Sequence, residues 1–194
     1  MAKLSSVCVY CGSSNTVPES FLEAAEELGR RIAEAGLRLV YGGGTVGLMH
    51  RVATGAAAAN GAVTGIIPGY LRNREGRGPT PGEIVVVDTM HERKRQMAER
   101  AQAFAVLPGG FGTLDELFEI VTWRQLGLHD RPIVLVNLAG YWTPLLEMLD
   151  RMATTNFVDA ASRRLIVTVS TVAEVVPALL RQDPATSGLG SDLV

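Results

Sequence analysis

Short hydrophobic runs alternate with amphipathic stretches along the whole chain. The runs are nearly continuous, which is typical of buried strands, and they lie at residues 7–10, 37–41, 62–67, 84–87, 103–107, 133–137 and 165–169. The stretches between them show helical spacing and lie at residues 18–35, 46–60, 90–101, 113–126, 142–154 and 172–180. This order predicts an α/β fold, a doubly wound, Rossmann-like parallel sheet with helices on both faces.

Two segments depart from this alternation. Residues 68–82 are rich in Pro, Gly and Arg and have no periodicity, so they are predicted to form a loop or lid. Residues 182–194 are polar and contain Gly and Ser, which predicts a disordered tail. Residues 1–181 are expected to form a single nucleotide-binding domain, because the length suits one hydrophobic core.

Composition indicates the compartment of the protein and the partners it is expected to lack. No uncharged apolar run approaches the roughly 20 residues that span a bilayer, and the N-terminus leads straight into a strand without a signal-peptide pattern. We therefore expect a cytoplasmic protein without a membrane partner. The net charge of −2 argues against a general nucleic-acid-binding protein.

The two cysteines, Cys8 and Cys11, form a CxxC pattern within a strand-like segment. Such a pattern can indicate a redox pair or half of a zinc site. Residues three apart on a strand point to opposite faces, and no second ligand pair occurs elsewhere in the sequence. We therefore expect two buried thiols, and no metal site.

The most informative segment follows the strand at 103–107 and reads PGGFGTLDE over residues 108–116. Glycines let a backbone approach a ligand closely, and the free N–H groups of a helix start favour an anion. The segment lacks the P-loop pattern of nucleoside triphosphatases. As an alternative, Thr113 and Glu116 have the spacing of a helix capping box.

A second segment, residues 88–94 (DTMHERK), begins the helix predicted at 90–101. Thr89 and Glu92 form another candidate capping box, which places Arg93 and Lys94 in the first turns of the helix. The helix dipole disfavours cations there. Either a bound anion or an opposing carboxylate compensates them, or both side chains are simply solvated.

Residues 42–47 (GGGTVG) contain a GxGxxG pattern that follows the second strand. The ribose-binding acid of a dinucleotide site is missing, because no Asp or Glu occurs between Glu34 and Glu75. A nicotinamide cofactor is therefore disfavoured, although Gly43 and Gly44 can still line a nucleotide pocket. The histidines, His50, His91 and His129, are scattered and form no ligand cluster.

Taken together, these motifs resemble the LOG ("lonely guy") family of cytokinin-activating phosphoribohydrolases, whose members are often mislabelled lysine decarboxylases. The resemblance covers about residues 7–180. Its two most specific pieces, found together, are MHxRK at 90–94 and PGGxGTxxE at 108–116. Weaker pieces are CGSS at 11–14, YGGG at 41–44 and TWxQLG at 122–127.

The resemblance implies a homodimer that needs no metal or other cofactor and cleaves nucleoside 5′-monophosphates, often N6-modified adenosine monophosphates, to free base and ribose 5-phosphate. It implies that Arg93 and Glu116 are the catalytic pair. The implied substrate-binding residues are Glu75, Met90, Arg93, Lys94, Gly109, Gly110, Phe111, Gly112, Thr113 and Thr122. Gly12, Ser13, Gly43 and Gly44 are possible pocket-lining residues. The sequence of the loop around Glu75 looks specific to this chain and not typical of the family.

Three other functions are alternatives to nucleotide hydrolysis. A non-catalytic carrier of a phosphate-bearing cofactor, such as the related molybdenum-cofactor carriers, would not require both Arg93 and Glu116. An NAD-linked oxidoreductase would need the missing ribose acid. A lysine decarboxylase would need a lysine for its pyridoxal phosphate, and only Lys94 is placed near the candidate site.

Overall fold

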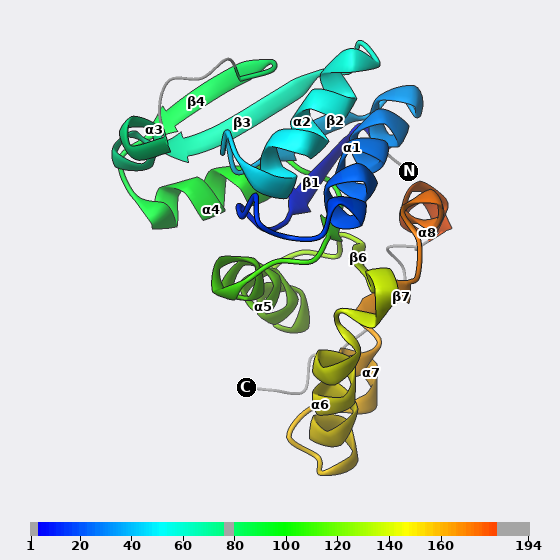
Figure 1. The fold of residues 1–194 in the computed structure, drawn as a ribbon. Coiled ribbons are helices and arrows are strands. Elements are labelled where there is room, and N and C mark those ends of the chain that lie inside the picture. Colours follow the sequence, from blue (N-terminus) through cyan, green and yellow to red (C-terminus); the bar gives the residue numbers. More distant parts are fainter. Residues whose placement is uncertain (1–3, 76–79, 182–194) are drawn as a thin grey trace.

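The computed structural model describes residues 4–75 and 80–181. Its strands form one seven-stranded parallel sheet with the order β4-β3-β2-β1-β5-β6-β7 (Figure 1). The strands are β1 (Ser6–Tyr10), β2 (Arg38–Tyr41), β3 (Val63–Pro68), β4 (Glu83–Val87), β5 (Phe104–Val106), β6 (Ile133–Val136) and β7 (Ile166–Val169). The α-helices are α1 (Glu19–Glu34), α2 (Gly47–Ala58), α3 (Gly69–Glu75), α4 (Met90–Glu99), α5 (Phe111–Gln125), α6 (Thr143–Thr154), α7 (Ala160–Arg163) and α8 (Val175–Arg181), and the 3-10 helices are η1 (Leu138–Gly140) and η2 (Val172–Glu174).

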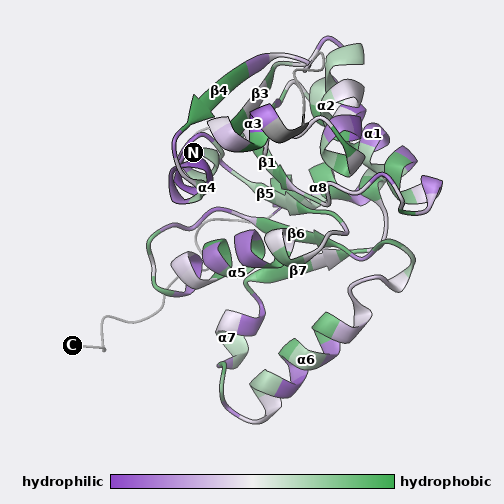
Figure 2. Cartoon of the chain, turned by 60° about the vertical axis from the view of Figure 1, so that its left-hand side comes forward, coloured by the Kyte–Doolittle hydropathy of each residue, from purple (hydrophilic) through white to green (hydrophobic). Residues whose placement is uncertain are grey.

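Each face of the sheet carries its own hydrophobic cluster. On one face, α1, α2 and α8 pack through residues such as Leu28, Val52 and Val175. On the other face, α4, α5 and α6 pack through residues such as Met97 and Leu117. The strands are mostly hydrophobic, whereas the helices mix hydrophobic and hydrophilic residues (Figure 2). This arrangement is the doubly wound α/β fold that the sequence predicts.

The sheet reverses its strand order between β1 and β5. From β1 the chain builds outward to β4 and then returns to pair β5 with the free side of β1. In such sheets the loops at the carboxyl ends of the two central strands separate and leave a crevice for a ligand. The glycine segment that follows β5 therefore lies at the place where this fold binds its ligands.

Cys8 and Cys11 are buried free thiols on opposite faces of the sheet, as predicted. Cys8 packs with the α4 and α5 side, whereas Cys11 packs with the α1 and α2 side. Burial raises the pKa of both thiols well above the ordinary value, which keeps them protonated. The pair is therefore part of the core.

The prediction of a loop over residues 68–82 was wrong in its first half. The structure places α3 at Gly69–Glu75, and β3 extends to Pro68. The Pro and Gly residues that suggested a loop lie at the ends of the segment, while the Leu, Arg and Glu between them are good helix formers. A helix of seven residues is too short to show a clear period.

Two other boundaries differ from the prediction. Helix α5 begins at Phe111 with Gly110 as its N-cap, so Thr113 lies inside the first turn and is not a cap. Helix α7, which Asp159 caps by accepting a hydrogen bond from Ser162 N at 2.7 Å, was not predicted because it is only four residues long. The predicted disordered tail, 182–194, lies outside the described residues. That residues 1–181 form a single domain stays a prediction.

In the described part of the chain, no helix is long and apolar enough to cross a membrane.

Candidate active site

A cavity of about 380 Å³ opens at the carboxyl ends of the central strands, beside the switch point. Its volume is in the range of sites that hold small ligands. Loops after β1 and β2, helices α3 and α4 and the start of α5 all contribute to it. The residues that line it are Cys11, Gly12, Ser13, Gly42, Met49, Ile67, Leu71, Met90, Arg93, Lys94, Gly110, Phe111, Gly112, Thr113, Asp115 and Glu116.

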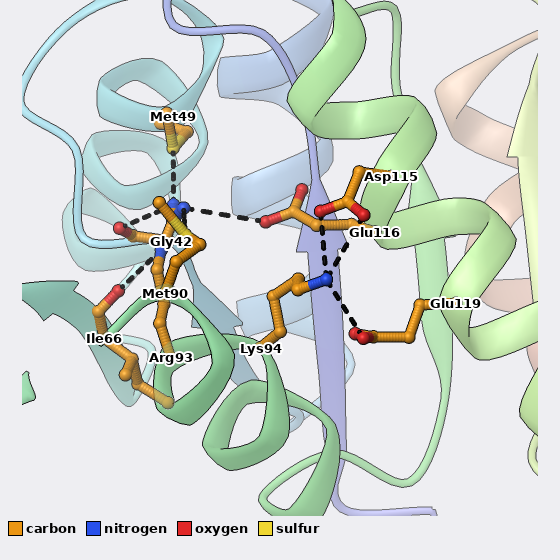
Figure 3. Close-up of polar contacts among 9 residues, drawn as sticks. All are labelled: Gly42, Met49, Ile66, Met90, Arg93, Lys94, Asp115, Glu116 and Glu119. Carbon is orange, nitrogen blue, oxygen red and sulfur yellow. Dashed lines mark hydrogen bonds and ion pairs between the residues drawn. The ribbon is translucent and has the colours of Figure 1, made fainter.

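Arg93 lies almost fully buried in α4 and is held by uncharged acceptors (Figure 3). Its Nε donates to the carbonyl oxygen of Ile66 at 3.2 Å, and its Nη2 donates to the carbonyl oxygen of Gly42 at 3.0 Å. The thioether of Met90 lies 3.3 Å from Nη1, and that of Met49 lies 3.8 Å from Nη2. These contacts fix the orientation of the guanidinium, and none of them supplies a negative charge.

Gly42 is the residue that makes room for this guanidinium. A Cβ atom at Gly42 would lie 1.9 Å from Nη2 of Arg93, which is far inside van der Waals contact. The first glycine of the GxGxxG pattern thus has a steric reason in this fold that involves no dinucleotide. The carbonyl of the same residue accepts one of the hydrogen bonds that orient Arg93.

Glu116 faces Arg93 from α5. Its Oε1 lies 3.9 Å from Nη1 of Arg93, which is too long for a hydrogen bond but close enough for electrostatic attraction. Burial raises the pKa of the Glu116 carboxyl to about 7, even though the charge of Arg93 acts in the opposite direction. At neutral pH the carboxyl is therefore divided between its protonated and ionised forms.

This placement rules out the capping-box interpretation of Thr113 and Glu116. Because Gly110 is the N-cap of α5, Thr113 does not occupy the capping position. In the other segment, Thr89 caps α4 by accepting a hydrogen bond from Glu92 N at 3.1 Å, as predicted. The carboxylate of Glu92 accepts from Asp88 N instead of completing a reciprocal box.

Lys94 is compensated in a different way from Arg93. Its Nζ lies 3.0 Å from a carboxylate oxygen of Asp115 and 3.0 Å from one of Glu119. Burial alone would lower the pKa of Lys94, but hydrogen bonds and charge from these two acids outweigh it and raise that pKa. Of the explanations offered by the sequence, opposing carboxylates account for Lys94, whereas Arg93 faces the more distant carboxylate of Glu116.

The glycine segment after β5 leads its backbone into the cavity. Counted from the N-cap, the first four N–H groups of a helix have no acceptor within the helix. In α5 these groups belong to Gly110, Phe111, Gly112 and Thr113, all of which line the cavity. Gly109 lies just behind them, where a Cβ would meet Oγ1 of Thr113 at 2.1 Å. The result is a cluster of N–H donors at the positive end of the helix dipole, which favours an anion.

Most residues singled out from the sequence meet in this cavity. Gly12, Ser13, Met90, Arg93, Lys94, Gly110, Phe111, Gly112, Thr113 and Glu116 line it. Gly43, Gly44, Gly109 and Thr122 are not among the lining residues, although Gly43 packs against Ile67 and Gly109 against Thr113, both of which line the cavity; Thr122 is exposed on α5. Glu75 is the last residue of α3, and its side chain lies outside the described part of the structure.

Several lining residues had no signal in the sequence. Met49, Ile67 and Leu71 look like ordinary hydrophobic positions, and only the strand order brings them to the cavity. Gly42 and Asp115 belong to the two glycine-containing motifs, at 42–47 and 108–116. Their position next to Gly43 and Glu116 could therefore have predicted that they line the cavity. In the described ranges, no group of three or more His, Cys, Asp or Glu side chains is arranged to hold a metal ion.

The fold and the cavity define a Rossmann-like α/β protein whose candidate site lies at the topological switch point and combines a glycine-rich helix start with a buried Arg–Glu pair. Residues 49–179 match the family described as "possible lysine decarboxylase", and the chain belongs to this family, which includes the LOG proteins. The resemblance stated from the motifs is confirmed.

Curated relatives and solved structures agree with this assignment. The chain is 43% identical to cytokinin riboside 5′-monophosphate phosphoribohydrolase LOG7 of Arabidopsis thaliana, over 97% of this chain and 87% of that protein. It is 44% identical to the LOG phosphoribohydrolase of Oryza sativa subsp. japonica, over 88% of this chain and 70% of that one. The molybdenum cofactor carrier protein of Chlamydomonas reinhardtii matches with a TM-score of 0.69 at 23% identity, covering 93% of this chain and 98% of the carrier, which shows a shared fold.

The site does not fit the lysine decarboxylation in the family's description. That reaction needs pyridoxal phosphate joined to a lysine as a Schiff base, which forms from the neutral amine. Among the described residues, Lys94 is the only lysine. Its two carboxylate partners raise its pKa and keep it protonated. The cavity therefore lacks the free amine that this cofactor requires.

Proposed function

We propose that the protein hydrolyses the N-glycosidic bond of nucleoside 5′-monophosphates that carry adenine or N6-modified adenine, including cytokinin riboside 5′-monophosphates. Water is consumed, and the products are the free base and ribose 5-phosphate. The observation that carries this proposal is the buried Arg93–Glu116 pair, 3.9 Å apart, beside the anion-binding start of α5. A carrier protein would need the anion site but not this pair.

The 5′-phosphate binds at the start of α5 in this proposal. The N–H groups of Gly110, Phe111, Gly112 and Thr113 supply donors, and the positive end of the helix supplies a favourable potential. Gly109 allows the close approach of the loop to Thr113, and Gly12, which packs against Gly109, lines the cavity together with Ser13. Binding the phosphate away from the scissile bond positions the ribose for reaction.

Glu116 and Arg93 act at the glycosidic bond. As the base departs, positive charge develops on the ribose, and an ionised Glu116 stabilises that charge or orients the attacking water. Because its pKa is about 7, a large fraction of the carboxyl is ionised at neutral pH. Arg93 lowers the energy of that ionised form, and its Nη1 is directed toward the same region.

The remaining substrate contacts follow from the cavity. Met90 lies against Arg93 and lines the wall, and it contacts the nucleotide. Lys94 has three N–H donors and uses them on Asp115 and Glu119, so at most one is left for the nucleotide. Gly43 packs against Ile67, which lines the cavity. Thr122 is exposed on α5, and we propose that it and Glu75 complete a site together with a second subunit.

The working form in this proposal is a homodimer in the cytoplasm. Phe118 on α5 and Leu126 and Leu128 just after it are exposed apolar residues, and a second copy would cover them in the proposed dimer. The free buried thiols of Cys8 and Cys11 suit a reducing compartment. A fully active monomer by light scattering at working concentration would exclude the dimer.

The decisive experiment incubates the protein with AMP, N6-isopentenyl-AMP and adenosine and measures release of free base by chromatography. We expect release from both monophosphates, a much lower kcat/KM for adenosine, and full activity in the presence of EDTA. The Glu116→Gln protein serves as the inactive control. Absence of base release from both monophosphates by a folded protein would refute the proposed function, and equal kcat/KM for AMP and adenosine would refute the phosphate site.

A further inference from the structure

We infer that Tyr141 is a positioning residue for the 5′-phosphate, acting through the peptide group between Gly109 and Gly110. This inference rests on the proposed function, because it deepens the account of the same anion site. Tyr141 follows η1, after β6, and belongs to none of the motifs that the sequence singled out. It does not line the cavity.

Tyr141 is tied to the glycine segment by one hydrogen bond. Its hydroxyl donates to the carbonyl oxygen of Gly109 at 2.7 Å, the usual length for an O–H donor in proteins. One residue earlier, the carbonyl oxygen of Pro108 accepts a hydrogen bond from Gly12 N at 3.0 Å. Two successive peptide groups of the segment are therefore held by contacts outside the segment.

The geometry of the peptide bond converts this contact into an effect on the cavity. In a trans peptide the carbonyl of one residue and the N–H of the next point in opposite directions. When Tyr141 holds the Gly109 carbonyl away from the cavity, the N–H of Gly110 is directed to the opposite side. Gly110 lines the cavity and Gly109 does not, so this N–H is one of the donors offered to the anion.

The segment needs such a restraint because of its composition. Glycine reaches more of backbone space than any other residue, so a peptide between two glycines rotates at low cost. A Cβ at Gly110 would meet no atom within 4 Å, so open space lies beside this residue on that side. Rotation of the peptide would turn the carbonyl toward the phosphate and replace attraction with repulsion.

Tyr141 is itself held in place by its ring. The ring makes edge-on contacts with Phe21, at a centroid distance of 5.9 Å, and with Trp142, at 4.7 Å. Trp142 N donates to Oδ1 of Asn137 at 2.7 Å, which anchors the turn. Replacing Tyr141 with Phe keeps the ring contacts and removes only the hydroxyl, so the hydrogen bond can be tested alone.

The test compares Tyr141→Phe with Thr155→Val. Thr155 Oγ1 also donates to a backbone carbonyl at 2.7 Å, that of Arg151, at the exposed C-cap of α6, which does not line the cavity. Calorimetry measures Kd for ribose 5-phosphate, base release measures kcat/KM for AMP and adenosine, and thermal unfolding checks the fold. Loss of one hydrogen bond predicts a Kd about threefold to tenfold higher for Tyr141→Phe, with kcat/KM falling for AMP but not for adenosine.

The outcomes separate this inference from the proposed function. If Tyr141→Phe binds ribose 5-phosphate as tightly as the parent protein, or loses affinity no more than Thr155→Val, the positioning role is overturned. If the parent protein binds ribose 5-phosphate but releases no base, the proposed function fails, and the Kd comparison still decides the role of Tyr141. If the parent protein does not bind ribose 5-phosphate, the positioning role falls even where base is released.

Discussion

Arg93 and Lys94 are consecutive residues of α4 that face the consecutive residues Glu116 and Asp115 of α5, yet the two contacts differ in kind (Figure 3). Lys94 meets two carboxylates at 3.0 Å each, and one of them, that of Asp115, is well exposed. Arg93 meets uncharged carbonyls and thioethers, and the carboxylate that faces it, that of Glu116, lies 3.9 Å away.

The difference separates a contact that joins two helices from one that is available for chemistry. The charge of Lys94 is neutralised by its partners, and this contact holds α4 against α5. The charge of Arg93 is oriented but left largely uncompensated, next to an acid whose pKa burial raises to about 7. Such poorly neutralised, buried groups are costly for stability and are typical of functional sites.

The largest expected effect comes from comparing two substitutions, one of the acid that faces Arg93 and one of an acid that pairs with Lys94. Glu116→Gln keeps the shape of the side chain but removes the charge that faces the ribose, so we expect kcat to fall by about 10²–10³. Glu119→Gln makes the same chemical change beside Lys94 and should leave kcat within about threefold of the parent, a difference below roughly 0.7 kcal/mol. Steady-state base release from AMP measures both. Equal losses in the two variants would contradict the division of roles.

The second effect concerns the space that Gly42 leaves for the guanidinium of Arg93. In Gly42→Ala the new Cβ would overlap Nη2 of Arg93, so the guanidinium must shift, and a shift of about 1 Å can lower kcat up to about 100-fold. Gly69→Ala is the matched control, because a Cβ there would lie at an ordinary 3.6 Å from Cγ1 of Val86. A Gly42→Ala protein with parental kcat would show that the orientation of Arg93 does not matter.

The third effect is the pH dependence that follows from Glu116. If the ionised carboxylate is the active form, kcat/KM should fall about tenfold per pH unit below pH 7, the pKa of Glu116 in the folded protein. Glu116→Gln should lack this limb of the profile. An unchanged limb in that variant would assign the titration to another group.

Stability should respond to pH in the opposite direction. The folded pKa of Glu116, about 7, lies above the value of 4.5 expected in the unfolded chain, so the folded state binds more protons between pH 4.5 and 7. The free energy of unfolding therefore decreases as pH rises through this window, by up to about 3 kcal/mol relative to Glu116→Gln. Denaturant unfolding of both proteins at pH 5 and pH 8 measures the difference.

The smallest effect on catalysis is expected at Lys94. Lys94→Met keeps the buried stem but removes the charge that joins α4 to Asp115 and Glu119. We expect a loss of about 1–2 kcal/mol in the free energy of unfolding, because the two acids are only partly buried, and a decrease in kcat/KM of no more than about tenfold. A loss of kcat as large as that of Glu116→Gln would place Lys94 in the chemistry.

The sequence by itself determined the order of the strands and helices along the chain and the chemical groups near the site. Alternating periods of hydrophobicity report which side of each element is buried, because that pattern is local. The glycines after β5 and the caps of helices are also local signals, so the sequence could indicate that the start of α5 faces the cavity. Where local signals were weak, as in the short helices α3 and α7, the prediction failed.

Only the tertiary structure decided which of these groups act on one another. The contacts of Arg93 with Ile66 and Gly42 join residues 27 and 51 positions apart, and the order of strands in the sheet brings them together. The raised pKa of Glu116 depends on burial by several elements at once. The contact of Tyr141 with Gly109 spans 32 positions between the loops that follow β5 and β6. Distances and burial of this kind arise from packing, which no stretch of sequence encodes alone.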